Sequence, residues 1–317
     1  MDQPAQSRAC AGERAAREGA GPQDAAPAGG GPPASAHGDT PRFERLAAAG
    51  AAQGAAHVIE ELGLWQRPAG ERARLLLNMV STADGRATLG GRSGPISADA
   101  DRALFHELRG AVDAVLVGAG TVRAERYGRI IPDPARRALR RSRGLSEEPL
   151  ACIVSGRMAL DGEIPLLAAP SARVVVLTAS AASLPGPAAH VEYVRAARDG
   201  ALDLPTALAE LHQRFGVRLM LCEGGPHLAC QLLADGLVDE LFLTLSPKLA
   251  GGAGHRGTRS EGPGRSGSQD AQALRILAGE ELQPPVELEL LGVLRSGASL
   301  FLRYRVPARE RQRHPIG

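Results

Sequence analysis

Glycine and acidic residues follow three apolar segments of this sequence, and each group has the composition of a ligand-binding turn. Glycine lets the backbone approach a ligand, and a helix that starts after such a turn offers free N–H groups to an anion. If the preceding strands are parallel, the three turns share one edge of the sheet, where open α/β sheets bind ligands. We therefore predict a site for a phosphorylated cofactor, with three unrelated structural turns as the alternative. The turns are Thr82-Ala83-Asp84-Gly85, Gly118-Ala119-Gly120-Thr121 and Glu223-Gly224-Gly225-Pro226.

Residues for other kinds of chemistry are scarce. The single lysine, Lys248, follows no glycine-rich loop, so a P-loop nucleotide site is excluded. The eight histidines form no metal-ligand cluster at useful spacing, and we expect no metal site. The four cysteines form no CxxC pair, which favours buried, reduced thiols and a cytoplasmic location.

Length and charge restrict the class of protein. The 317 residues are enough for one large domain or two small ones, and 44% hydrophobic and 23% charged residues are ordinary for a soluble globular protein. A net charge of +2 argues against nucleic acid as a partner. No apolar run is long enough for a membrane span, and we expect a small-molecule substrate instead.

The segments that must position the three turns alternate between strand and helix patterns. Apolar runs predict strands, and leucines in helical spacing predict an amphipathic helix over 204–215. Further helices are expected from the N-cap Ser97 to Arg109, over 122–126, and over 226–236. The predicted strands cover 74–80, 112–117, 150–154, 173–178, 191–194, 217–222, 239–245, 286–294 and 299–306.

This order predicts a three-layer α/β domain with a mostly parallel central sheet and a C-terminal antiparallel hairpin. A TIM barrel fits less well, because the helices are too few and the strands finish as a hairpin. We place the domain at 72–306, after an Ala/Gly/Pro-rich disordered tail at 1–41 and a short helical lead-in at 42–71. A glycine-rich loop at 251–270 is expected to be flexible, and 307–317 form a C-terminal tail.

Five arginines lie between residues 136 and 143. An exposed, solvated helix is the favoured interpretation of this segment, and a phosphate-binding patch is the alternative.

The three turns and their flanking residues resemble a known family. The segments NMVSTADGRAT, FHELRGAVDAVLVGAGTVRAE and VRLMLCEGGPHLACQLLADGLVDELFLTLSPKLAGG are similar, in order and spacing, to the reductase domain of riboflavin biosynthesis. That domain forms the C-terminal half of the bifunctional deaminase-reductase and also occurs alone. The resemblance covers about 72–306 and implies a dihydrofolate reductase-like fold, NADPH as cofactor and a homodimer. The implied reaction reduces the ribosyl group of a phosphorylated aminopyrimidine to a ribityl chain.

The resemblance also implies which residues hold the cofactor. The glycines of the second and third turns would let NADPH approach the backbone, and the start of the helix at Pro226 would receive its pyrophosphate. Arg157 suits the adenosine 2′-phosphate through its fork of donors, although a surface arginine is an equal alternative. The implied cofactor residues are Gly118, Gly120, Thr121, Glu125, Ser155, Arg157, Gly224, Gly225, Pro226, His227 and Leu228.

On the substrate side, the resemblance implies Ser93 and Arg109, with a helix cap as the alternative for Arg109. Glu223 is expected to accept hydrogen bonds from amino groups of a heterocycle. Asp84 is the second candidate catalytic residue, with a turn-forming Asp-Gly as its alternative. Asn78 and Arg129 complete the substrate set; Arg129 is the candidate for an arginine that riboflavin enzymes carry downstream of the second turn.

The sequence departs from the family around its substrate residues. Pro95 stands where many members carry an aromatic residue, and Glu125-Arg126-Tyr127-Gly128 replaces the usual Asp-Asp-Pro. These differences leave three functions open: reduction of a ribosylaminopyrimidine phosphate, reduction of dihydrofolate or another pterin or heterocycle, and nucleotide binding without catalysis.

Overall fold

The computed structural model describes residues 52–251 and 274–307. The predicted tail at 1–41, the C-terminal residues from 308 and most of the glycine-rich loop lie outside the described residues. Within the described part of the chain, no helix is long and apolar enough to cross a membrane. The elements are α1 (Ala55–Glu61), β1 (Arg74–Thr82), α2 (Asp99–Ala111), β2 (Ala114–Gly118), α3 (Ala119–Ala124), α4 (Pro134–Ser142), β3 (Leu150–Val154), β4 (Arg173–Thr178), β5 (His190–Arg195), β6 (Ala197–Arg198), β7 (Ala201–Leu202), α5 (Leu204–Phe215), β8 (Leu219–Cys222), α6 (Pro226–Ala234), β9 (Glu240–Ser246), β10 (Glu289–Ser296) and β11 (Ser299–Arg305).

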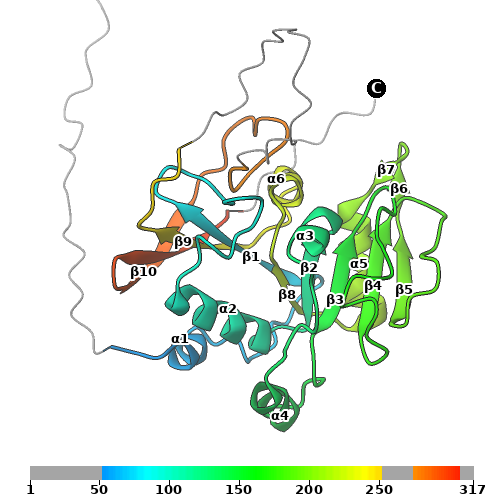
Figure 1. Ribbon diagram of the computed structural model, residues 1–317, viewed down its shortest axis with the longest axis horizontal. Helices are drawn as coiled ribbons and strands as arrows, with labels where there is room; N and C mark the ends of the chain where they lie inside the picture. Colours follow the sequence, from blue (N-terminus) through cyan, green and yellow to red (C-terminus); the bar gives the residue numbers. More distant parts are fainter. Residues whose placement is uncertain (1–51, 252–273, 308–317) are drawn as a thin grey trace, which may run out of the picture. The chain divides into compact units, whose positions relative to one another are not determined.

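The large sheet has the strand order β10-β11-β9-β1-β8-β2-β3-β4-β5, with β10 and β5 at its two ends (Figure 1). All pairings from β9 to β5 are parallel, whereas β11 pairs antiparallel with both β9 and β10. The predicted α/β class, with a mostly parallel sheet and a C-terminal hairpin, is confirmed. Strand β8 lies between β1 and β2, so the turns that follow these three strands are neighbours.

The central parallel strands β1, β8, β2, β3 and β4 are mostly buried on both faces, as is usual for such strands. Side chains alternate between the faces, so Leu75 and Leu77 pack with α5 and α6, whereas Leu76 packs with α1 and α2. The chain therefore forms three layers, with helices on both sides of the sheet.

Local signals explain where the helices begin and end. Asp203 caps α5 by accepting a hydrogen bond from the Thr206 N–H, and Gly216 ends the helix in the left-handed conformation. The predicted cap of α2 is wrong: Ala98 occupies the N-cap position, and the Ser97 hydroxyl donates to the carboxylate of Asp101 instead.

The arginine-rich segment forms helix α4, but it is not a fully solvated helix. Arg140 is completely buried and donates to the backbone carbonyls of Gly110 (2.8 Å) and Val112 (2.7 Å), at the end of α2. Burial, followed by the nearby charge of Arg67, lowers the pKa of Arg140 to about 10. The sequence pattern misses this role because a run of arginines does not show which one turns inward.

Candidate functional site

The turns after β8 and β2 meet beside β1 at the carboxyl edge of the sheet. A cavity of about 330 Å³ opens there. One part of its wall comes from Gly120, Thr121, Gly225 and Pro226, all predicted cofactor residues. Another part contains the predicted substrate residues Asn78, Ser93 and Glu223. The structure thus brings much of the predicted cofactor set and substrate set to one cavity.

The turns after β2 and β8 are bonded directly to each other. The Gly118 N–H donates to the Gly224 carbonyl at 2.8 Å. A Cβ atom at Gly118 would lie 3.4 Å from the Gly225 nitrogen, and one at Gly225 would lie 2.7 Å from Thr121 Oγ1. Gly224 has φ of +83°, which favours glycine. Glycine is therefore favoured at 224 by the backbone conformation and at 225 by the close approach of Thr121.

Helix α6 begins at the cavity with Gly225 as N-cap and Pro226 at its first position. Its first backbone N–H groups, on His227 and Leu228, have no acceptor among the described residues, whereas the Ala229 N–H donates to Gly225. Free N–H groups at a helix N-terminus attract anions. The residues present therefore fit the pyrophosphate of a dinucleotide.

Ser155 and Arg157 follow β3, which pairs with β2 so that Val154 lies opposite Gly118. Ser155 is buried, and its N–H donates to Leu177 of β4. Arg157 is exposed. Both residues lie on the same edge as the glycine turns but do not line the cavity.

Ser93 and Glu125 are paired at the cavity wall. Glu125 Oε1 accepts hydrogen bonds from the backbone N–H of Ser93 (2.7 Å) and from its hydroxyl (2.9 Å). Glu125, predicted on the cofactor side, thus holds Ser93, predicted on the substrate side.

Arg109 and Glu223 are bonded to one another rather than exposed to a ligand. Arg109 Nε donates to Glu223 Oε1 at 2.6 Å, and Arg109 Nη2 donates to Oε2 at 2.7 Å. The Tyr127 hydroxyl also donates to Glu223 Oε2, at 2.6 Å. The Glu223 side chain is 2% exposed and that of Arg109 is 11% exposed, and Arg109 does not line the cavity. These contacts let both groups position the wall, and because Glu223 lines the cavity its contact with substrate stays a prediction.

The electrostatics of this cluster keep its charges fixed. Burial is the largest single influence on the pKa of Arg109 and lowers it, but the charge and hydrogen bonds of Glu223, with the contribution of Tyr127, together raise that pKa above its usual value. Burial and then the charge of Glu223 raise the pKa of Tyr127 well above its usual value, so its hydroxyl remains a donor. The Arg109 guanidinium also lies over the rings of Phe105 (4.2 Å) and Tyr127 (5.3 Å).

Asp84 does not line the cavity, although it follows β1 as predicted. Its carboxylate accepts from the backbone N–H of Gly251 (2.7 Å), the N–H of Ala250 (3.2 Å) and the Thr82 hydroxyl. The Thr82 hydrogen bond, with those from the backbone, lowers the pKa of Asp84 to about 2. Its contacts support the turn-forming alternative, in which Asp84 joins two loops.

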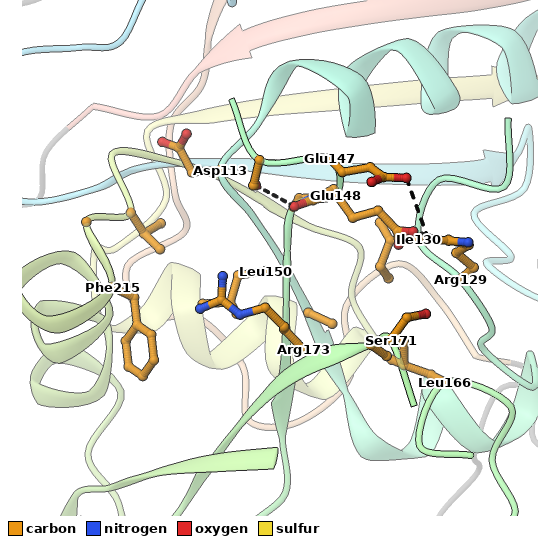
Figure 2. Close-up of a pocket in the computed structure, with 16 residues that line it drawn as sticks. Asp113, Arg129, Ile130, Glu147, Glu148, Leu150, Leu166, Ser171, Arg173 and Phe215 are labelled. Atoms are coloured by element: carbon orange, nitrogen blue, oxygen red, sulfur yellow. Dashed lines mark hydrogen bonds and ion pairs between the residues drawn. The ribbon is translucent and has the colours of Figure 1, made fainter. Parts of the chain in front are cut away.

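The structure separates Arg129 from the site. Arg129 lines a second cavity, of about 370 Å³, at the amino ends of β2, β3 and β4. Figure 2 shows Arg129 beside Glu147 and Glu148, with Arg173 among the other residues that line this cavity. Arg129 is thus paired with two carboxylates at the opposite end of the sheet from the cavity that contains Asn78 and Ser93.

Several cavity residues were not predicted from the sequence, among them Asp101, Phe105, His106 and Tyr127. Burial, followed by the charges of Arg109 and Arg136, lowers the pKa of His106, so a neutral imidazole faces the cavity at neutral pH. Asp101, Phe105 and Arg109 are four residues apart, which places them on one face of α2. This four-residue spacing was the feature of the sequence that could have identified Asp101 and Phe105 as neighbours in the site.

A family model described as the RibD C-terminal domain matches residues 73–291. A 2,5-diamino-6-ribosylamino-4(3H)-pyrimidinone 5′-phosphate reductase of Methanothermobacter thermautotrophicus is 28% identical over 65% of this chain and 91% of its own length. A reductase of the same name from Archaeoglobus fulgidus is 29% identical over 57% of this chain and 83% of its own.

Among solved structures, a pyrimidine reductase-like protein from Corynebacterium diphtheriae matches with a TM-score of 0.57 and 24% identity. The match covers 74% of this chain and 92% of that protein. The two proteins share a fold.

Proposed function

This chain belongs to the RibD C-terminal domain family, and from that premise we propose that it is an NADPH-dependent reductase of a phosphorylated ribosylaminopyrimidine. Family membership and its relatives, which are named reductases, make it an oxidoreductase. The observation that carries the proposal is the cavity shared by the glycine turns and by Asn78 and Ser93. A dinucleotide on the turns and a heterocycle beside α2 would meet there.

The cofactor residues have distinct tasks in this proposal. Gly118, Gly224 and Gly225 keep the backbone close, and the free N–H groups of His227 and Leu228 receive the pyrophosphate. Ser155 and Arg157, on the same edge, would bind the 2′-phosphate that distinguishes NADPH from NADH. When bound, NADPH supplies a hydride.

The substrate residues orient the carbon that is reduced. The reaction breaks the bond between the ribosyl C1′ and the ring oxygen: C1′ gains the hydride and the ring oxygen gains a proton from water, so that the cyclic ribosyl group becomes an open ribityl chain. No protein nucleophile is needed, because the catalytic task is to hold the two reactants in contact. Ser93, fixed by Glu125, and Asn78 present hydrogen-bonding groups to the substrate, while the Arg109–Glu223 pair holds the wall behind it.

The test is a measurement of NADPH oxidation by the purified full-length chain. We expect turnover with 2,5-diamino-6-ribosylamino-4(3H)-pyrimidinone 5′-phosphate or with its uracil counterpart, and a ribityl product by mass spectrometry. Turnover of dihydrofolate alone would assign the chain to pterin reduction. Tight NADPH binding without turnover of any of these compounds would leave a nucleotide-binding protein and reject the proposal.

We also propose a homodimer in the cytoplasm. Leu290 and Leu294 of the edge strand β10 and Leu300 of β11 are exposed apolar side chains. Exposed apolar edge strands are usually covered in the assembled protein. This supports β10 as the part of the sheet that a second copy contacts.

A further inference from the structure

Three carboxylates line the cavity at the carboxyl edge, and two of them already hold protein groups. Glu223 is bonded to Arg109 and Tyr127, and Glu125 to both the backbone and the hydroxyl of Ser93. Asp101 is the third. Within the described residues its only hydrogen-bond partner is the Ser97 hydroxyl, which donates to Oδ2.

Asp101 is unusual because it is buried with so few donors. The residue is 7% exposed, and it reaches the surface at the cavity wall. A buried carboxylate with a single hydrogen bond is costly, whereas each of its oxygens can accept two. Oδ1 and one lone pair of Oδ2 therefore remain for a ligand.

The side chains around Asp101 suit a flat heterocycle. Phe105 follows one helical turn later and lines the same cavity, so an aromatic ring and a carboxylate lie side by side on α2. An aromatic side chain stacks on a planar ring, and a carboxylate accepts two parallel N–H bonds from the edge of such a ring.

We propose that Asp101 determines specificity by accepting two hydrogen bonds from a pyrimidinone, one from the ring N–H and one from the neighbouring 2-amino group. This inference rests on the proposed function and names the substrate within it: the 2-amino compound rather than the uracil. A uracil presents a carbonyl oxygen at C2, and that oxygen would face the Asp101 carboxylate with no proton between them. The resulting repulsion and the loss of one hydrogen bond both disfavour uracil. The two reductases similar to this chain are named for a 2,5-diamino substrate.

The decisive measurement is the ratio of kcat/KM for the diaminopyrimidinone phosphate to that for its uracil counterpart. We expect the unaltered chain to prefer the diamino compound by about 10- to 100-fold, the range of a hydrogen bond to a charged group. Asp101→Asn keeps the shape but offers an N–H to the C2 carbonyl. It should lower kcat/KM for the diamino compound by a similar factor and raise it for the uracil, so that the preference is lost.

Asp99→Asn is the matched control, because it makes the same charge change two residues away on a side chain that is 98% exposed. It should leave the ratio unchanged. Equal turnover of both compounds by the unaltered chain, or an unchanged ratio in Asp101→Asn, would overturn the inference.

A binding experiment separates this inference from the proposed function. Calorimetry with 2-amino-4-pyrimidinone and with uracil, in the presence of NADPH, needs no turnover. We expect the amino compound to bind at least about 10-fold more tightly, and Asp101→Asn to abolish that difference. If neither phosphorylated substrate is reduced but this difference is found, the proposed function fails and Asp101 keeps its role. If the two rings bind equally, the inference fails whatever the activity.

Discussion

Arg109 and Glu223 form a two-pronged ion pair that joins helix α2 to the turn after β8. The pair connects residues that are 114 positions apart in the sequence. Because Glu223 directly precedes Gly224 and Gly225, the position of the turn proposed to bind the cofactor depends on a side chain from α2, the helix proposed to face the substrate. The buried Arg109–Glu223 ion pair therefore fixes the two sides of the cavity relative to each other.

Replacing Arg109 by Ala should lower the free energy of unfolding by about 3–5 kcal/mol, because Glu223 would keep a buried, unpaired charge. Urea denaturation measures the loss. Combining Arg109→Met with Glu223→Gln should recover at least half of it, since the amide still accepts from Tyr127. A loss below about 1 kcal/mol for Arg109→Ala would show that the pair is exposed to water.

Replacing Gly225 by Ala should weaken NADPH binding at least about 10-fold, because the new Cβ atom would lie 2.7 Å from Thr121 Oγ1 and push the two turns apart. Fluorescence titration with NADPH measures the affinity. Gly292→Ala on β10, where no atom lies within 4 Å of the added Cβ, is the control and should bind normally. The effect should shrink in a Thr121→Ala background; if it does not, the contact with Thr121 is not its cause.

Replacing Arg157 by Ala should raise the dissociation constant for NADPH about 10-fold and leave that for NADH unchanged, because only NADPH carries the 2′-phosphate. Isothermal titration of both nucleotides provides the comparison. Arg173→Ala removes an exposed arginine at the other end of the sheet and should alter neither affinity. An equal loss of affinity for NADPH and NADH would show that Arg157 does not contact the 2′-phosphate and acts elsewhere in the site.

Asp84 should contribute stability that is lost in acid. Its folded pKa is about 2, below the usual 3.8, since Thr82 and the backbone of Gly251 bond the ionised carboxyl. The contribution is fully present above pH 3.8 and disappears as the pH falls towards 2. Melting temperatures should show this step in the unaltered chain and in Asp99→Asn, but not in Asp84→Asn. A step of equal size in Asp84→Asn would assign it to another carboxyl.

Replacing both Leu290 and Leu294 by Lys should convert the proposed dimer to a monomer, because two charges would be buried at the edge of β10. Sedimentation velocity measures the oligomeric state. Glu287→Lys is the control for the effect of added positive charge near this edge. A dimer that survives the double substitution would exclude this edge.

The order of the elements was predictable because the apolar patterns of both the strands and the helices are strong in this chain. Continuous apolar runs such as Leu75 to Leu77 identify strands buried on both faces, and the leucines of α5 identify an amphipathic helix. The glycine turn after β8 was predictable because its backbone needs residues without a side chain: Gly224 has a positive φ, and a Cβ atom at Gly225 would lie 2.7 Å from Thr121 Oγ1.

The partners of charged side chains were not predictable. Glu223 and Arg109 were both assigned to ligands, yet their closest partners are each other, across a distance in sequence that no local pattern encodes. Arg129 was assigned to the substrate because it follows the second turn in the sequence. In the structure the chain runs back after that turn, and Arg129 lies at the opposite end of the sheet. Spacing identifies which residues share a helix face, as for Asp101 and Phe105, but not which cavity they meet.

The insertion of β8 between β1 and β2 determines when the site can be assembled during folding. More than 90 residues separate the end of β2 from the start of β8, so the central gap in the sheet closes only after this long segment has been arranged. Such non-local pairing slows folding. A nascent chain that ends before residue 219 has neither Glu223 to neutralise Arg109 nor the turn that faces Gly118. If the proposed NADPH site is correct, the chain should bind NADPH only after β8 and the turn that follows it have joined the sheet.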